Sequence, residues 1–215
     1  MAKITDIYQK YKITRSLQEH QLRVAAVAKQ ICDNLTVQVD TDSVVKACLL
    51  HDMANILKFD FSFAHLFAPE GVEYWKKVRE EVAKKYQSQD EHQVTVMIAK
   101  EIGVSDRVLD YIDSVGFRYT LKTLARPDIE PKICDYSDTR VAPTKITSVQ
   151  ERMEEGRIRY LDRPSKWIKP EQYQQLIQAC FDMEKQVFAS CKIGPEDITD
   201  QSSAPVIEQL LAYEI

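Results

Sequence analysis

Glycine is scarce in this chain: five of its 215 residues are glycine, and eight are proline. A turn-rich β fold places both residue types at its many turns, so their low number favours helices. The chain also lacks a run of about 18 apolar residues, the minimum for a membrane-spanning helix. Its first residues lack the apolar core of a secretion signal. We therefore expect a helical, cytoplasmic protein with no membrane partner.

Paired cysteine motifs are missing as well. The five cysteines form no C-x-x-C pair, and their number is odd. A zinc ribbon and a disulfide framework both need cysteine pairs at defined spacings, so neither fits this pattern. We expect reduced thiols, as in the cytosol.

A strong net charge is absent too. The formal net charge is −4 at pH 7, and the isoelectric point lies near 5.7. Because domains that bind nucleic acids are usually basic, we expect no nucleic-acid polymer as a partner. Apolar residues make up 44% and charged residues 29% of the chain, an ordinary balance for a soluble globular protein. The length suits one domain with a small appendage.

Apolar residues recur with a helical period in most of the chain, for example from Leu17 to Ile31. No segment alternates cleanly between apolar and polar residues, as a half-buried strand would. Expected helices lie at about residues 4–11, 17–31, 44–57, 73–86, 91–102, 106–114, 117–125, 131–143 and 171–191, with a final helix within 195–215. The pattern therefore predicts an all-α fold.

An adjacent His51-Asp52 pair directly follows an apolar run that ends at Leu50. Charge near a core costs several kcal/mol unless it is paired or bound to a metal. Divalent transition metals accept imidazole nitrogen and carboxylate oxygen together. Seen alone, the pair also fits a plain helix end. A metal site on helices draws ligands from several of them, and His20 and a later aspartate could complete one.

Three motifs occur in a fixed order: Glu19–Ala25 around His20, Leu49–Met53 around the His-Asp pair, and Ile133–Asp138. His51 follows His20 by 31 residues, and Asp135 follows Asp52 by 83. In this order and spacing the chain resembles the HD-domain metal-dependent phosphohydrolase superfamily over roughly residues 14–145. The resemblance implies an HD-domain-like helical bundle at residues 1–145. Residues 146–215 are expected to form a helical extension that packs on this core.

The resemblance also implies a divalent metal ion as cofactor, one of Mn, Fe, Co, Ni, Mg or Zn. The implied ligands are His20, His51, Asp52 and Asp135. Asp138 competes with Asp135, but the usual ligand of the family follows a small residue, as Asp135 follows Cys134. His92 lies where some members carry an extra histidine. Three interpretations of His92 fit the sequence equally well: a ligand of a second metal, a contact to phosphate, or a histidine that simply stands at the start of a helix.

Residues near the pair are expected to serve catalysis. Asn55 stands where relatives often carry Lys or Glu, and its amide can hydrogen-bond phosphate but cannot act as a base. Asp60 matches an acidic residue of some nucleotide-cleaving relatives, and Lys58 could reach the phosphate. The residues expected to bind the substrate are Arg140, Arg23 and His92. Each of these charges also fits a solvated surface position.

We expect a phosphohydrolase that cleaves a phosphate ester of a nucleotide or related small molecule with metal-activated water. The alternative is a degenerate HD-domain protein, a nucleotide- or metal-binding regulatory module with little turnover. The missing acid at Asn55 and the total of four histidines support this alternative. A homodimer is a reasonable expectation for a helical chain of this size.

Overall fold

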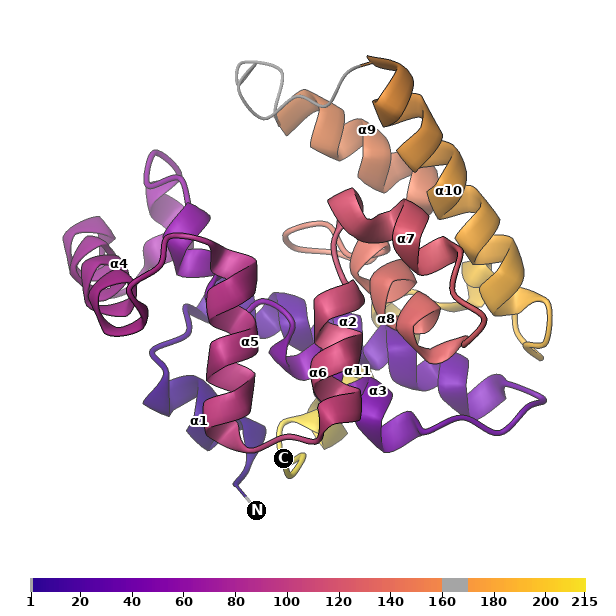
Figure 1. Ribbon diagram of the computed structural model, residues 1–215, viewed down its shortest axis with the longest axis horizontal. Helices are drawn as coiled ribbons and strands as arrows, with labels where there is room; N and C mark the ends of the chain where they lie inside the picture. The colour runs from indigo at the N-terminus through magenta and orange to yellow at the C-terminus, as the bar shows by residue number, and fades with distance from the viewer. Residues whose placement is uncertain (1, 160–169) are drawn as a thin grey trace.

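The computed structural model describes residues 2–159 and 170–215, and every regular element in these two ranges is a helix (Figure 1). The prediction of an all-α fold is therefore confirmed. The α-helices are α1 (Ile4–Lys10), α2 (Arg15–Asn34), α3 (Thr41–Leu50), α4 (Val72–Tyr86), α5 (Glu91–Ile102), α6 (Asp106–Ser114), α7 (Thr120–Leu124), α8 (Glu130–Thr139), α9 (Val149–Arg159), α10 (Pro170–Phe188) and α11 (Asp200–Leu210). Short 3₁₀ helices are η1 (Asn55–Lys58), η2 (Ala64–Phe67), η3 (Phe117–Tyr119) and η5 (Pro195–Asp197).

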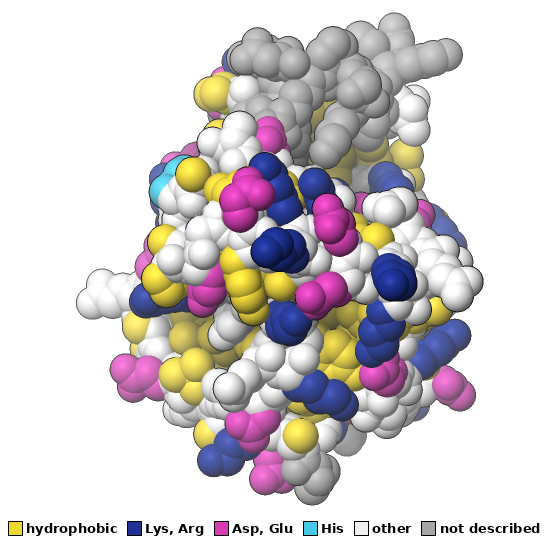
Figure 2. Space-filling view, turned by 90° about the vertical axis from the view of Figure 1, so that its left-hand side faces the viewer, with side chains coloured by type: hydrophobic (Ala, Val, Ile, Leu, Met, Phe, Trp, Pro, Cys, Tyr) yellow, Lys and Arg dark blue, Asp and Glu magenta, His cyan; other side chains and the backbone are white. Residues whose placement is uncertain are grey.

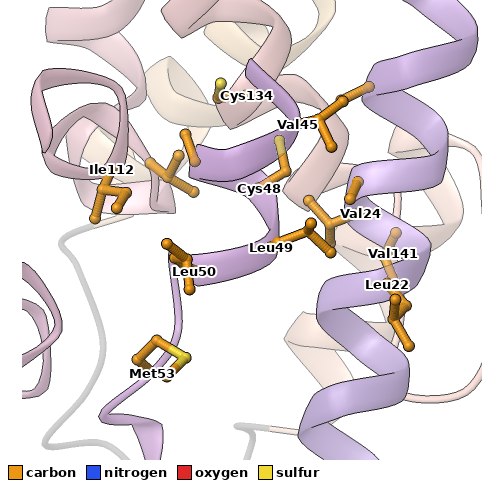
Figure 3. Packing of buried hydrophobic residues seen from close by; sticks show 14 of the residues in the cluster. Leu22, Val24, Val45, Cys48, Leu49, Leu50, Met53, Ile112, Cys134 and Val141 are labelled. Atoms are coloured by element: carbon orange, nitrogen blue, oxygen red, sulfur yellow. The ribbon is translucent and has the colours of Figure 1, made fainter. Parts of the chain in front are cut away.

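The long helix α2 lies at the centre of the bundle and contacts α3, α8 and α11. Its start is fixed locally, because the Thr14 side chain accepts a hydrogen bond from the backbone N–H of Leu17. Its apolar face packs against α3, with Val24 opposite Val45 and Leu49 (Figure 3). Full burial of such a side chain contributes about 1.5–3 kcal/mol. This packing holds the polar residues of α2 beside the end of α3.

Helix α3 ends at Leu50, whereas its pattern predicts a helix to about residue 57. The difference has a tertiary cause. The backbone N–H of Asp52 donates to Gln21 Oε1 at 3.3 Å, and that of Ala54 donates to Thr95 Oγ1 at 3.1 Å. Side chains from α2 and α5 thus take up donors that a longer helix would use itself. The chain turns over residues 51–54 before η1 begins.

A second difference lies between α6 and α8. The helix expected over residues 117–125 is divided into η3 and the short α7. Gly116 precedes η3 with φ of 129°, a backbone conformation that other residues rarely adopt. The helix expected over residues 131–143 ends earlier, at Thr139. Helices α5 and α6 have the bounds that the sequence predicts.

The helices after residue 145 contact the rest of the bundle. Helix α10 packs on α7 and α8, and α11 packs on α2. Cys180, Met183 and Leu210 belong to the same apolar core as α2 and α3. Residues 160–169 of the expected extension lie outside the described residues. A domain boundary at residue 145 stays a prediction.

The surface bears charges of both signs. On the face that carries α4, basic and acidic side chains are interspersed around apolar ones (Figure 2). This face therefore has no extended field of one sign of the kind that binds a polyanion. Within the described ranges, no helix combines the length and apolarity that crossing a bilayer requires.

Candidate metal centre

Four side chains from three segments meet beside the end of α3. We call His20 (α2), His51 and Asp52 (the turn after α3) and Asp138 (α8) the His-Asp cluster. His20 Nε2 lies 3.1 Å from Asp138 Oδ1 and 3.7 Å from Asp52 Oδ2. His51 Nε2 lies 3.4 Å from Asp138 Oδ1 and 3.5 Å from Asp52 Oδ2. Both imidazoles thus point one nitrogen at both carboxylates.

The hydrogen bonds of His51 fit a metal ligand. Its Nδ1–H donates to the backbone carbonyl of Cys48 at 2.8 Å, which leaves a lone pair on Nε2 when the ring is neutral. Nε2 is buried and has no hydrogen-bond partner within the described residues. Metal-binding histidines characteristically hold their other nitrogen in such a hydrogen bond. One ligand atom each from His20, His51 and Asp52 lies within 4.8 Å of the others, so a single ion can reach all three.

Without a metal, the cluster is held together by charge. Burial by itself lowers the pKa of His51, but the charges of Asp52 and Asp138 outweigh it and raise this pKa to about 9. Burial raises the pKa of Asp138, yet its contacts with His20 and His51 hold it well below the ordinary value. At neutral pH a proton on His51 therefore occupies the place that a cation would take.

The stability of the metal-free protein should consequently depend on pH through His51. Its folded pKa of about 9 exceeds the ordinary 6.5, so its contribution is complete below pH 6.5 and is lost as pH rises through 9. At about 1.36 kcal/mol per pH unit, the loss is about 3 kcal/mol. Urea unfolding with a chelator should show the wild type losing this much relative to His51→Gln between pH 6 and 10. A difference that stays constant with pH would contradict the charged pairing.

Asp135, which the sequence favours as a ligand, lies elsewhere on α8. Its Oδ1 accepts the backbone N–H of Gly116 at 2.8 Å, and its Oδ2 is buried without a hydrogen-bond partner in the described residues. Burial raises its pKa to about 7, although the Gly116 N–H opposes this rise. Asp138, by contrast, contacts both histidines of the cluster. We therefore propose Asp138 in place of Asp135 as the fourth ligand.

Arg140, which the sequence suggests for substrate binding, has a structural position instead. Arg140 is only 3% exposed, and its guanidinium donates to the backbone carbonyls of Thr147, Pro195 and Ile198. It also donates to the Tyr136 hydroxyl at 2.6 Å. These partners occupy the guanidinium inside the protein, so we propose a structural role for Arg140 in place of substrate binding. Arg140 instead ties the end of α8 to the segment before α11.

Arg23 follows His20 by one helical turn and is partly buried. Its guanidinium lies 3.8 Å from Glu19 on its own helix and 3.8 Å from Asp200 at the start of α11. At 3.8 Å, both ion pairs are longer than a hydrogen bond. Its expected role in substrate binding stays a prediction.

The three expected catalytic residues lie in and just after η1. Asn55 is buried at 6% exposure, and Lys58 Nζ lies 3.5 Å from Glu91 Oε1. Asp60 Oδ1 accepts the backbone N–H of Ser62 at 2.9 Å. They follow the His-Asp pair directly in the chain, and their catalytic roles stay predictions.

His92 lies in the first turn of α5. Its Nε2 is 3.0 Å from Asp113 Oδ1 on α6, and its ring centroid is 4.8 Å from that of Tyr119. These contacts fit a substrate-binding histidine and a structural one equally well. The substrate-binding role of His92 therefore stays a prediction.

Two residues with a role in the site are absent from the sequence predictions. Gln21 is fully buried and fixes the turn at Asp52. Its position next to His20 was the available signal. Gly116 holds the carboxylate of Asp135, and its signal was the scarcity of glycine, which makes each one informative.

Comparison with known proteins agrees with this geometry. The HD domain family matches residues 17–139, which is more than half of the chain and includes the whole His-Asp cluster. Neither the curated proteins nor the solved structures gave a match. HD domains usually bind divalent metals, and their family generally comprises hydrolases. With its helical fold, its converging histidines and aspartates and this match, the chain belongs to the HD domain family.

Proposed function

We propose that this protein is a metal-dependent phosphohydrolase that cleaves a phosphate ester of a nucleotide or related small molecule. One observation carries the proposal: nitrogen and oxygen atoms from α2, the turn after α3 and α8 converge around the buried Nε2 of His51, which lies near two carboxylates but makes no hydrogen bond within the described residues. Buried carboxylates and imidazoles need a compensating positive charge, which a proton or a bound cation supplies.

The donor set suits a divalent ion. We propose His20, His51, Asp52 and Asp138 as its ligands. Two imidazoles and two carboxylates are compatible with Mn, Fe, Co, Ni, Mg or Zn. A divalent ion supplies a bound water of lowered pKa and polarises a phosphoryl oxygen.

Other residues of the chain would bind and orient the substrate. The Asn55 amide is placed by η1 just after the His-Asp pair, where its N–H groups can donate to phosphate oxygens. Lys58 would add positive charge against the phosphate. Asp60 would accept a proton from water or return one to the leaving group.

The alternative function, a regulatory module that binds without turnover, also has an observation in its favour. Asn55 is a buried amide at the position where many relatives carry a charged side chain. An amide cannot exchange a proton near neutral pH, so this position offers no general base. Turnover decides between the two functions.

The test is phosphate release from a panel of nucleotides and simple phosphate esters, with Mn, Co, Ni or Mg added. Asp52→Ala removes a proposed ligand and should lower turnover by more than about 100-fold, since loss of supporting residues alone costs 10–100-fold. Asp182→Ala is the matched control, because this partly exposed aspartate pairs only with side chains of its own helix, Gln178 and Lys185, in the described contacts. It should keep wild-type turnover.

Metal binding, measured by calorimetry on the same proteins, separates the outcomes. Turnover that is lost with Asp52→Ala supports the hydrolase. Metal binding without turnover on any ester would favour the regulatory module. Failure of the wild type to bind any of these ions would contradict the hydrolase and a metal-binding module alike.

A further inference from the structure

A short turn is tied to α8, the helix that carries Asp138 of the His-Asp cluster. Residues 116–119, which we call the 116–119 turn, connect α6 to α7 and include η3. The backbone N–H of Gly116 donates to Asp135 Oδ1 at 2.8 Å. Asp135 precedes Asp138 on α8 by three residues, about 4.5 Å along the helix axis. This hydrogen bond therefore anchors the turn to the helix that carries a proposed ligand.

The other neighbour of the turn is the start of α5, which is also tied to the site. Thr95 accepts the backbone N–H of Ala54 at 3.1 Å, so α5 is fixed to the chain that follows His51 and Asp52. His92 lies one helical turn before Thr95, and its ring stacks at a tilt against Tyr119 of the 116–119 turn. These two contacts connect α5 both to the chain after the His-Asp pair and to the 116–119 turn.

Arg118 is an exposed cation of this turn. Its side chain is 52% exposed, and its guanidinium lies 4.9 Å from the centre of the Tyr119 ring. Its nearest acid is Glu91, at 3.9 Å, and Lys58 approaches the same Glu91 oxygen to 3.5 Å. Both distances exceed that of a hydrogen bond. Within the described residues the guanidinium of Arg118 makes no hydrogen bond, so its donors are available to a ligand.

These contacts point to an anion. Two cations share one carboxylate, and a long surface ion pair of this kind contributes about 0–1 kcal/mol. A phosphate group offers Arg118 a bidentate, charge-assisted contact instead, which is considerably stronger. The Tyr119 ring supports the guanidinium from one side and limits its rotamers. Glu91 would be the internal competitor that the incoming anion displaces.

Resting on the proposed function, we infer that Arg118 binds a second phosphate group of the substrate, beyond the one hydrolysed at the His-Asp cluster. The preferred substrates would then carry at least two phosphates, as a nucleoside diphosphate does. Asp135 acts here as a positioning residue, because it holds the 116–119 turn through Gly116.

The test measures binding of ADP and AMP to the metal-stripped protein by calorimetry. The wild type should bind ADP more tightly than AMP. Arg118→Ala should weaken ADP binding by about ten- to a hundredfold, the usual loss for a charge-assisted contact, and remove most of the preference. Arg118→Lys should lose part of it, since a lysine cannot bind in a bidentate manner. Glu91→Gln should strengthen ADP binding, because the competing charge is gone.

Arg107→Ala is the matched control for an arginine paired with an acid. Arg107 contacts Asp40 at the start of α3, whereas His51 follows the other end of this ten-residue helix, about 15 Å away. Its loss should leave the preference for ADP unchanged.

Two variants test the positioning role of Asp135. Asp135→Ala removes the acceptor of the Gly116 N–H and should reduce the preference for ADP. Asp135→Asn keeps an oxygen acceptor at this position and should restore the preference. A purely structural role would show equal losses for ADP and AMP in Asp135→Ala.

Equal effects of Arg118→Ala on ADP and AMP, or no effect on either, would overturn the inference. Because the measurement needs no hydrolysis, its failure is separable from that of the proposed function. A preference for ADP that depends on Arg118, with no turnover on any ester, would overturn only the hydrolase. Turnover that depends on Asp52, without a preference for ADP, would overturn only the role of Arg118.

Discussion

Divalent-metal binding is expected to weaken by at least about 100-fold when Asp138 is replaced by Asn. Asp138 is the carboxylate that contacts both His20 and His51, at 3.1 and 3.4 Å. Substitutions that only support a ligand cost about 10–100-fold in affinity, so loss of a direct ligand should cost more. The Asn side chain keeps the shape of the aspartate and removes its charge, which limits the change to the chemistry of the site.

Asp135→Asn is the matched control on the same helix. The Asp135 carboxyl is buried, and its pKa is raised to about 7, so a neutral amide is a close substitute for it. The amide oxygen can still accept the N–H of Gly116. We expect this variant to bind metal like the wild type and to be at least as stable at pH 8, where the buried carboxylate would otherwise be charged.

Calorimetric titration with Mn²⁺, after removal of bound metal, compares the three proteins directly. Circular dichroism shows whether each variant retains its helices. If Asp135→Asn loses the metal while Asp138→Asn keeps it, Asp135 is the ligand after all and the assignment to Asp138 is wrong.

Replacing Arg140 with Met should lower the free energy of unfolding by about 3 kcal/mol or more, because each buried carbonyl left without a donor costs about 1–3 kcal/mol. Arg140 is 3% exposed, and its donors satisfy the carbonyls of Thr147, Pro195 and Ile198. Met fills a similar volume but donates no hydrogen bond, so these carbonyls would lose their partner. The contact between α8 and the segment before α11 should loosen first.

Arg107→Met provides the control for an arginine at the surface. Its side chain is 60% exposed and, within the described residues, forms an ion pair with Asp40 alone. Such pairs contribute about 0–1 kcal/mol, so its loss should be small. Urea unfolding of both variants measures the difference. A loss below about 1 kcal/mol for Arg140→Met would contradict the structural role of this residue.

The local parts of the fold were predictable from the sequence. The periods and bounds of α5 and α6 follow from apolar spacing, capping residues and Gly103, all of which act within a few residues. The three ordered motifs likewise suggested the HD domain, which the match over residues 17–139 supports. His20, His51 and Asp52 could be selected because their order and chemistry are properties of the sequence.

The end of α3 was beyond such reasoning. The apolar pattern continues to Leu57, but the helix stops at Leu50 because Gln21 and Thr95 bond the following backbone. These partners are 31 and 41 residues away in the chain. Only the packing of α2 and α5 against the turn brings them there. The same turn directs His51 and Asp52 toward α2.

The choice between two aspartates also depended on tertiary structure. Asp135 and Asp138 are three residues apart, so their side chains differ by roughly 60° around α8. The sequence specifies this angle, but the packing of α8 on α2, α3 and α6 sets which of the two faces the histidines. The burial of Arg140 also depends on tertiary structure, because the carbonyls that it contacts belong to residues 147, 195 and 198. The sequence alone determined the helical class, the family and the donor types; the rotation and contacts of the packed helices decided where some helices end and which donors meet.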